Sequence, residues 1–344
     1  MQPIPVKFRP VPKARVWGGH TLKPWFHETD PQPIGEYWVL SDHAEGPSII
    51  TGGAFDGMAL GNLLTTYPAA YLGNSPQPRF PLLIKFLEAA QNLSVQVHPD
   101  DVYGLAHAGD YGKTEAWYVL RAEESKSVVY GHKFATRAEM AAAIDAHTLV
   151  DGLEFRPIEA DDVVFVPSGT LHALLAGTTV LEVQQTSDVT YRVYDWDRVG
   201  TDGKPRSLHI AQSLAVTRFA PTPTPTPVPA LATSASVTLR RLATAEGWVL
   251  ERLVECGYFT IDRLAFTRAA HATLSRGESG NPDVLIVIDG AVDLHYAVDG
   301  EAAKMPLQRG ETVLIPATLM EYTVVSSSQY DAQILRVFYP STGN

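Results

Sequence analysis

Residues 161–174 read "DDVVFVPSGTLHAL", and residues 310–324, "GETVLIPATLMEYTV", repeat their pattern. Each stretch has an acidic residue, alternating apolar residues, a proline, and a polar residue five positions after the proline. That residue is His172 in the first stretch and Glu321 in the second. Alternation with a period of two is typical of β-strands, whose successive side chains point to opposite faces. The repetition is weak, and two diverged copies of one β-barrel explain it.

The regions around both stretches consist mostly of short apolar segments separated by Gly, Pro and Asp, which indicates many short strands joined by turns. Such a pattern suits a jelly-roll barrel closed on itself, with a lumen that can hold a ligand. The clear exception is residues 137–147, "RAEMAAAIDAH", whose alanine-rich composition predicts a helix. The sequence therefore predicts a mainly β protein of two barrels with a small helical elaboration.

A proline-rich segment, residues 220–236, separates the two halves of the chain. Five prolines fall among residues 221–229, and they remove backbone donors and fix φ, so the segment should be extended and solvated. We interpret it as a semi-rigid linker between a first domain of residues 1–219 and a second domain of residues 237–344. The alternative is a proline-rich motif that binds a partner protein.

The chain of 344 residues carries a net charge of −11 and is 45% hydrophobic, a composition typical of soluble globular proteins. The acidic balance argues against nucleic acids and anionic membranes as partners. No apolar run is long enough to cross a bilayer, and the N-terminal residues lack the apolar core of a secretion signal. Cys256 is the single cysteine, which excludes an intrachain disulfide. We therefore expect a cytoplasmic protein that is a monomer or a weak homo-oligomer.

Polar residues that strands would point inward are spread along the first half of the chain. In residues 94–101, "SVQVHPDD", period-two alternation places Gln96 and His98 on one face. Glu115 follows in an alternating stretch, and His172 lies just beyond a turn that contains proline and glycine. A lone strand histidine is more often structural. Two imidazoles, a carboxylate and an amide oxygen together make a plausible site for a divalent first-row metal.

Several distinct motifs follow one another over residues 13–215. They are "VWGG" (16–19), "IGEYWVLSD" (34–42), "PLLIKFLEAAQNLSVQVHPDD" (81–101), "GKTEAWYVL" (112–120), "VPSGTLHAL" (166–174) and "SDVTYRVYDWDR" (187–198). In this combination the chain resembles the type I mannose-6-phosphate isomerases, in their shorter bacterial form. The resemblance implies a tandem cupin fold and the interconversion of mannose 6-phosphate and fructose 6-phosphate, so that a small sugar phosphate is the substrate. The second barrel resembles the family's C-terminal cupin only loosely.

The resemblance further implies one zinc ion per chain and a catalytic arginine, Arg192 in "TYRVYD". The chemistry suits these groups, because moving a proton beside a carbonyl produces an enediolate whose charge needs a Lewis acid and fixed cations nearby. Zinc is also redox-silent, which spares an easily oxidised enediol. The implied zinc ligands are Gln96, His98, Glu115 and His172.

Four further residues match family positions around the substrate. Lys85 and Ser94 are associated with the phosphate end of the pocket, although Lys85 could also be a surface lysine and Ser94 an ordinary strand hydroxyl. The resemblance makes Lys113 a candidate for proton transfer. Glu182 lies ten residues before Arg192, and it could shuttle a proton between hydroxyls or only orient Arg192 through an ion pair.

The second barrel lacks the metal-binding pattern of the first. Glu321 stands where the first barrel has His172, and no counterpart of the pair Gln96 and His98 precedes it. We therefore predict a metal-free second domain that supports the first one by packing against it.

Three other functions fit parts of the sequence. They are a cupin isomerase acting on another sugar phosphate such as glucose 6-phosphate, an iron oxygenase with a similar histidine–carboxylate site, and a sugar-sensing protein without catalysis. The cationic residues of "GKTE" and "TYRVYD" favour an isomerase over an oxygenase. The intact set of metal ligands together with Arg192 argues against a non-catalytic protein.

Overall fold

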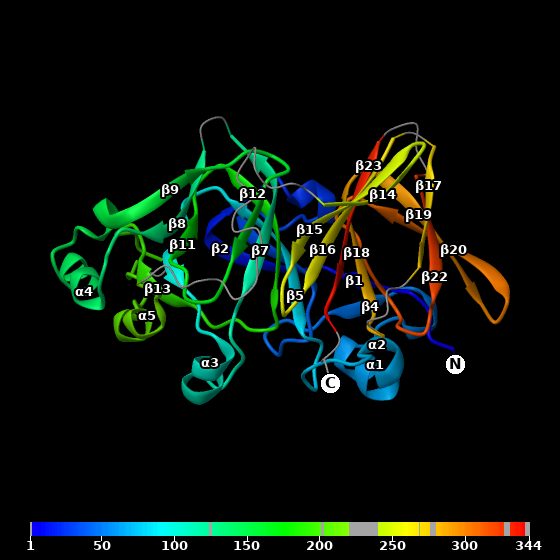
Figure 1. Cartoon of the computed structure of the whole chain (residues 1–344), viewed down its shortest axis with the longest axis horizontal. Helices are drawn as coiled ribbons and strands as arrows, with labels where there is room; N and C mark the ends of the chain where they lie inside the picture. Colours follow the sequence, from blue (N-terminus) through cyan, green and yellow to red (C-terminus); the bar gives the residue numbers. More distant parts are fainter. Residues whose placement is uncertain are drawn as a thin grey trace.

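The structure is a computed structural model that describes residues 2–123, 126–200, 203–219, 240–267, 269–275, 280–326 and 331–340. In this part of the chain two β assemblies lie side by side, and the helices lie at their periphery (Figure 1). Each assembly is built from two sheets of antiparallel strands. The predicted mainly β architecture of two barrels is confirmed.

The first barrel consists of a six-stranded and a five-stranded sheet. The six-stranded sheet has the strand order β10 (Val163–Val166), β7 (Glu115–Ala122), β12 (Thr178–Gln185), β5 (Leu82–Ala89), β3 (Ile34–Leu40) and β2 (Val11–Gly19). The five-stranded sheet has the order β13 (Tyr191–Tyr194), β6 (Val95–Val97), β11 (His172–Leu174), β8 (Ser127–His132) and β9 (Leu153–Pro157).

The second barrel consists of an eight-stranded and a four-stranded sheet. The larger sheet has the order β14 (Arg240–Ala245), β15 (Trp248–Glu255), β16 (Thr260–Phe266), β23 (Ala332–Phe338), β18 (Asp283–Asp289), β21 (Thr312–Ile315), β1 (Val6–Arg9) and β4 (Ile49–Thr51). The smaller sheet has the order β17 (His271–Ser275), β22 (Glu321–Ser326), β19 (Ala291–Val298) and β20 (Glu301–Gln308).

The helices are short. The α-helices are α1 (Leu60–Thr66), α2 (Pro68–Tyr71), α3 (Asp101–His107), α4 (Arg137–Asp145) and α5 (Ile210–Val216), and the 3₁₀-helices are η1 (Lys23–Phe26), η2 (Gly53–Phe55) and η3 (Leu149–Gly152). The helix predicted over residues 137–147 is confirmed by α4, which begins after Thr136, whose hydroxyl accepts a hydrogen bond from the amide of Glu139 (3.2 Å). In the described part of the chain, none of the helices has the length and apolar character that a membrane span requires.

The six-stranded sheet is buried on both faces, which explains the nearly unbroken apolar sequence of β5. On one face, Ile84 and Phe86 share a hydrophobic core with Val284 of the second barrel. The opposite face carries Lys85 and Glu182 into the lumen of the first barrel. One sheet therefore joins the two barrels and presents polar residues to the lumen.

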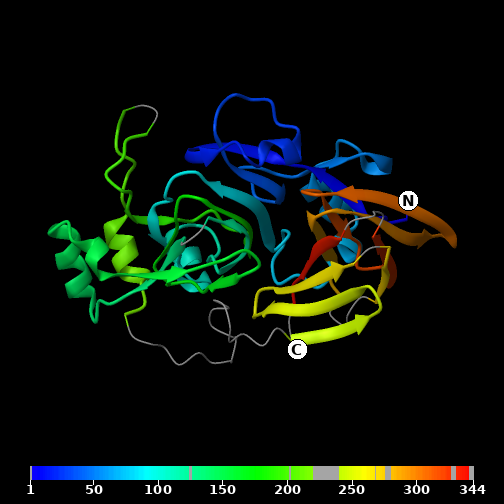
Figure 2. The ribbon, with the colours of Figure 1, turned by 90° about the horizontal axis from the view of Figure 1, so that it is seen from above.

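Two N-terminal strands complete the large sheet of the second barrel. In β1, Val6 lies opposite Leu314 of β21, and β4 pairs with the other side of β1. Figure 2 shows the N-terminus beside the second barrel. The predicted division of the chain did not include this pairing of N-terminal strands with the second barrel. Alternation along a strand assigns the faces of its side chains but does not identify the neighbouring strands. The proposed linker, residues 220–236, lies outside the described residues, so the division into domains stays a prediction.

Because β1 belongs to the N-terminal half of the chain and pairs with β21 of the second barrel, we predict that it stabilises the whole molecule. Phe8 is 6% exposed and belongs to the core shared by both barrels, whereas the neighbouring Arg9 is exposed. Phe8→Ala should therefore lower the free energy of unfolding by about 3–5 kcal/mol, as in other buried phenylalanine truncations. Arg9→Ala on the same strand is the control and should have little effect. Urea unfolding of both variants checks this, and equal small losses would contradict the role of β1.

Candidate metal centre and active site

The six-stranded sheet presents a row of large side chains to the lumen of the first barrel. Glu182 of β12 lies directly opposite Lys85 of β5 on one side and Trp117 of β7 on the other. Directly opposite residues of an antiparallel pair share a face, and Glu115 shares it too because it lies two residues before Trp117.

The five-stranded sheet presents a second row toward the first. Gln96 of β6 lies directly opposite His172 of β11 and, on its other side, opposite Arg192 of β13. The side chains of these three residues therefore follow one another across the sheet. Ser94 lies at the start of the same segment, and its hydroxyl is 3.3 Å from Oε1 of Gln96.

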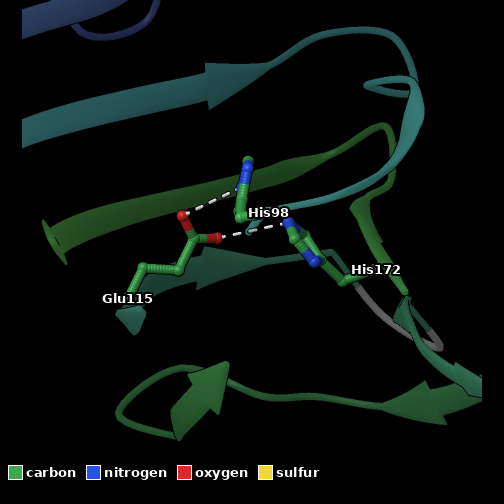
Figure 3. A group of neighbouring side chains, drawn as sticks. All are labelled: His98, Glu115 and His172. Carbon is green, nitrogen blue, oxygen red and sulfur yellow. Dashed lines mark ion pairs between the residues drawn. The ribbon is translucent and has the colours of Figure 1, made fainter. Parts of the chain in front are cut away.

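His98, Glu115 and His172 converge where the two rows meet (Figure 3). Nε2 of His98 is 3.4 Å from Oε2 of Glu115, and Nε2 of His172 is 3.3 Å from Oε1 of Glu115. One ligand atom from each residue lies within 4.8 Å of the others, and all three residues are buried. The amide nitrogen of Gln96 is 3.4 Å from Nε2 of His172. The four predicted ligands are thus neighbours.

Hydrogen bonds fix which nitrogen of each histidine faces Glu115. Nδ1 of His98 is 2.9 Å from the carbonyl oxygen of Val189, and Nδ1 of His172 is 2.8 Å from that of Thr170. A carbonyl oxygen only accepts, so Nδ1 carries the proton and Nε2 carries a lone pair. Among the described residues, Nε2 of His98 and both carboxylate oxygens of Glu115 are buried without a hydrogen-bond partner. Electron-rich atoms that face one another in this way fit a cation between them.

Charges of alternating sign lead away from this centre. Nζ of Lys113 is 3.3 Å from Oε2 of Glu115 and 3.8 Å from Oε1 of Glu182. Nζ of Lys85 is 3.0 Å from the same Oε1 of Glu182 and 3.5 Å from Oε2 of Glu36. Each of these buried charges therefore has partners of the opposite sign.

The far end of the series is Arg15, whose Nε donates a hydrogen bond to Oε1 of Glu36 (2.7 Å). Two indoles hold the carboxylates in place: Nε1 of Trp38 donates to Glu36 (2.7 Å), and Nε1 of Trp117 donates to Glu182 (2.9 Å). We call this series the charge ladder. It consists of Arg15, Glu36, Lys85, Glu182, Lys113 and Glu115.

The three glutamates of the ladder differ in their pKa values. Burial opposes ionisation of Glu36, but the charges of Lys85 and Arg15 outweigh it and lower the pKa of Glu36 to about 2. Burial likewise opposes ionisation of Glu115, but Lys113 and the two histidines hold its pKa well below the ordinary value. Burial and the charge of Glu115 instead raise the pKa of Glu182. Glu182 is therefore the glutamate of this set best suited to exchange a proton.

Burial also controls the protonation of the histidines. It acts together with the charge of Lys113 to lower the pKa of His98 to about 3. Burial lowers the pKa of His172 as well. Both imidazoles are therefore neutral near neutral pH, which is the form that binds metal ions.

A cavity of about 480 Å³ opens onto the ladder and onto the row of Gln96 and Arg192. Its volume suits a small-molecule ligand. Residues from both sheets and from the loops that flank them form its walls, and the polar ones include Arg15, Glu36, Lys85, Ser94, Gln96, Lys113, Glu182, Asp188, Thr190, Arg192 and Arg206. All predicted substrate-binding and catalytic residues line this one cavity.

Two alternatives from the sequence are wrong. Lys85 is 4% exposed, so it is not a surface lysine. The ion pairs of Glu182 within the described residues are to Lys85 and Lys113, so Glu182 does not orient Arg192 by pairing with it. Arg192 is half-buried, and its Nη1 donates instead to the carbonyl oxygen of Ser207 (2.9 Å).

Sequence reasoning missed several residues of the cavity, among them Glu36, Arg15 and Arg206. Glu36 and Trp38 alternate within residues 34–42, so the period of two could have placed Glu36 on the lumen face. Arg15 lies on β2 and reaches the site only through Glu36. Arg206 lies outside the described strands and helices and has no periodic pattern that could have pointed to it.

The second barrel has a different interior. Glu321, the counterpart of His172, is exposed. The buried carboxylate of Asp283 accepts hydrogen bonds from the hydroxyl of Tyr322 (2.8 Å) and from Nε of Arg336 (3.0 Å). That carboxylate is already neutralised by protein groups, and the absence of a metal from this barrel stays a prediction.

Comparison with known proteins gives concordant results. Residues 6–143 match the family model of the type I phosphomannose isomerase catalytic domain. A mannose-6-phosphate isomerase of Streptococcus mutans is 40% identical over 248 residues, which cover 72% of this chain and 74% of that protein. The mannose-6-phosphate isomerase ManA of Bacillus subtilis is 34% identical over 323 residues, covering 92% of this chain and 95% of its own.

Solved structures show the same architecture. The crystal structure of the mannose 6-phosphate isomerase from Bacillus subtilis superposes with a TM-score of 0.84 at 30% identity, covering 98% of this chain and all of the other (100%). A mannose 6-phosphate isomerase described as bound with zinc and yttrium has the same fold, with a TM-score of 0.70 at 17% identity. The predicted tandem cupin fold is confirmed, and the chain belongs to the type I mannose-6-phosphate isomerases, a family of aldose–ketose isomerases.

Proposed function

We propose that the protein interconverts mannose 6-phosphate and fructose 6-phosphate through an enediol(ate), with one zinc ion per chain in the first barrel. The observation that carries the proposal is the set of buried lone pairs on His98, Glu115 and His172, which face one another. Among the described residues, Nε2 of His98 and both carboxylate oxygens of Glu115 have no hydrogen-bond partner. Two imidazole nitrogens and one carboxylate form a donor set that catalytic zinc sites use, with a further position left for substrate. The amide of Gln96 adds a fourth donor when its oxygen turns toward the centre.

The choice of metal rests on the donors and on the reaction. Bound zinc would supply a redox-inert positive charge that polarises sugar oxygens and stabilises the developing oxyanion. The zinc-bound isomerase of the same fold is consistent with this choice.

Proton transfer is assigned to Glu182 and Lys113. Both line the cavity, and Lys113 lies between Glu182 and Glu115. The raised pKa of Glu182 suits a carboxyl that both takes and returns protons. Isomerisation needs one proton moved between neighbouring carbons and one moved between their oxygens, and two adjacent acid–base groups meet that need.

The charge ladder explains why the site suits a dianionic substrate. With all members ionised, its three cations and three carboxylates sum to zero. A divalent metal ion adds two positive charges, and a phosphate monoester brings about two negative charges. The ladder and a bound divalent metal ion together would therefore carry a net positive charge, which favours an anionic substrate although the whole chain carries a net charge of −11.

The stabilisation of the transition state is assigned to Arg192. It lies directly across from Gln96, and among the residues that the structure describes its buried Nε has no hydrogen-bond partner. A guanidinium held there would bind the oxyanion more strongly than the neutral sugar. Lys85 and Ser94 line the same cavity and remain candidates for binding the substrate. The cytoplasmic location and the monomeric or weakly oligomeric state also remain predictions.

A coupled assay tests the function. Mannose 6-phosphate is supplied and fructose 6-phosphate is measured as product, with glucose 6-phosphate tested alongside. We expect turnover of mannose 6-phosphate well above that of glucose 6-phosphate. The reverse preference would assign the protein to another sugar phosphate, and turnover of neither compound would refute the isomerase.

The proposed metal ligands predict that bound zinc and activity are lost together. His98→Ala and His172→Ala each remove a ligand, so both variants should lose bound zinc and activity together. His107→Ala is the control, because His107 is exposed at the end of α3. Elemental analysis and the coupled assay give the two readouts. Full zinc occupancy in both ligand variants would contradict the assignment.

The role of Arg192 predicts a catalytic defect in a folded protein. Arg192→Ala should bind zinc and melt within a few degrees of the parent, while kcat falls by about 10²–10³, as for the loss of one oxyanion donor. Arg192→Lys should recover only part of the rate because an ammonium lacks the planar fork. A near-parental kcat with a raised KM in Arg192→Ala would make the residue a substrate anchor instead.

A further inference from the structure

Three arginines cluster near one carboxylate at the edge of the cavity, and two of them bind it. Asp195, which directly follows β13, is 6% exposed. Its oxygens accept hydrogen bonds from Nε and Nη2 of Arg206 (2.7 and 2.5 Å) and from Nε and Nη2 of Arg198 (3.1 and 2.7 Å). Arg192 lies in the strand just before Asp195.

The cluster carries more positive than negative charge. Arg198 and Arg206 share the single charge of Asp195, and among the described residues neither has a second ion-pair partner. Arg192 forms no ion pair within the same part of the chain. Burial and the charge of Arg206 lower the pKa of Arg192, as expected where cations lie together. This group therefore has two uncompensated positive charges, which matches a phosphate dianion.

Lys85, which the family resemblance associates with the phosphate end of the pocket, lies in the charge ladder and not in the arginine cluster. Lys85 lies between the carboxylates of Glu36 and Glu182, so its charge is already compensated. The cavity carboxylate of Asp188 adds to the negative charge around Lys85. The uncompensated positive charge of the cavity lies instead at Arg192 and Arg206.

The order of strands gives the direction in which a substrate would extend. His172, Gln96 and Arg192 lie on β11, β6 and β13, and β13 is the edge strand of the sheet. With about 4.8 Å between neighbouring strands, Arg192 is roughly 10 Å of backbone spacing from His172. Arg206 is bound to Asp195, beyond the end of this edge strand. A sugar phosphate whose reacting carbons lie at the metal centre would extend its phosphate toward this edge.

We propose that Arg206 binds the phosphate group of the substrate, and that Asp195 and Arg198 position its guanidinium. The bonds to Asp195 occupy two of the five N–H donors of Arg206, which leaves the others for phosphate oxygens. The inference rests on the proposed function, because it takes a sugar phosphate as the substrate.

The test uses Arg206→Gln in the zinc-loaded protein. Loss of one charge-assisted contact should raise KM for mannose 6-phosphate about 10- to 100-fold and weaken competitive inhibition by inorganic phosphate by a similar factor. The kcat and the zinc content should stay near those of the parent. Arg206→Lys should recover part of the phosphate affinity and guards against a folding defect in the glutamine variant. The matched control is Arg156→Gln on β9, at the opposite edge of the same sheet, which removes the same charge from a half-exposed side chain.

The outcomes separate this proposal from the proposed function. If the parent protein isomerises mannose 6-phosphate but Arg206→Gln keeps a parental KM and a parental inhibition constant for inorganic phosphate, the phosphate role of Arg206 is overturned. A fall in kcat and zinc content with KM unchanged would make Arg206 a structural residue and would also overturn it. If the parent does not turn over the sugar phosphate, the proposed function fails. Calorimetric titration of parent and variant with inorganic phosphate then still decides whether Arg206 binds phosphate.

Discussion

The first barrel depends on one constraint: charges buried in its lumen must be paired. Glu36, Lys85, Glu182, Lys113 and Glu115 are each at most 6% exposed. An isolated charge at such a place would be strongly destabilising, and removal of one partner from a buried pair typically costs about 3–5 kcal/mol. The ladder satisfies this constraint by alternation, with each lysine between two carboxylates. The same arrangement keeps two neutral histidines and an ionised glutamate in the form that a metal ion requires.

The fold meets this constraint with one sheet used on both faces. Lys85 and Glu182 project into the lumen, while Ile84 and Phe86 on the other face of β5 share a core with the second barrel. The second barrel therefore covers the outer face of this sheet with apolar side chains and keeps that face out of water. The N-terminal strand β1 connects the two halves further by pairing with β21.

Much of the fold and of the candidate site could be predicted from the sequence, and what could not be predicted has a physical cause. Period-two alternation correctly grouped Gln96 with His98, and the family motifs placed Lys85, Lys113 and Glu182 near them. Alternation assigns a face to a side chain but does not say which strands become neighbours. The pairing of Glu182 with lysines, the contact of Glu36 with Lys85, and the position of β1 in the second barrel all depend on strand neighbours. Arg206 lies in a segment without periodicity, where only the folded structure shows its carboxylate partner.

If the buried charges of the ladder stabilise one another, Lys85 and Glu182 are energetically coupled, and a double-mutant cycle on these two residues measures that coupling. The free energy of unfolding in urea is measured for the metal-free parent, Lys85→Met, Glu182→Gln and the double variant. Each single variant should lose up to about 3–5 kcal/mol, because it removes one of the two ion-pair partners of a buried charge. The double variant should lose about 2 kcal/mol less than the sum of the two single losses. Losses that add to within about 0.5 kcal/mol would mean that the two side chains do not stabilise each other, and that the buried charges of the lumen do not depend on their pairing.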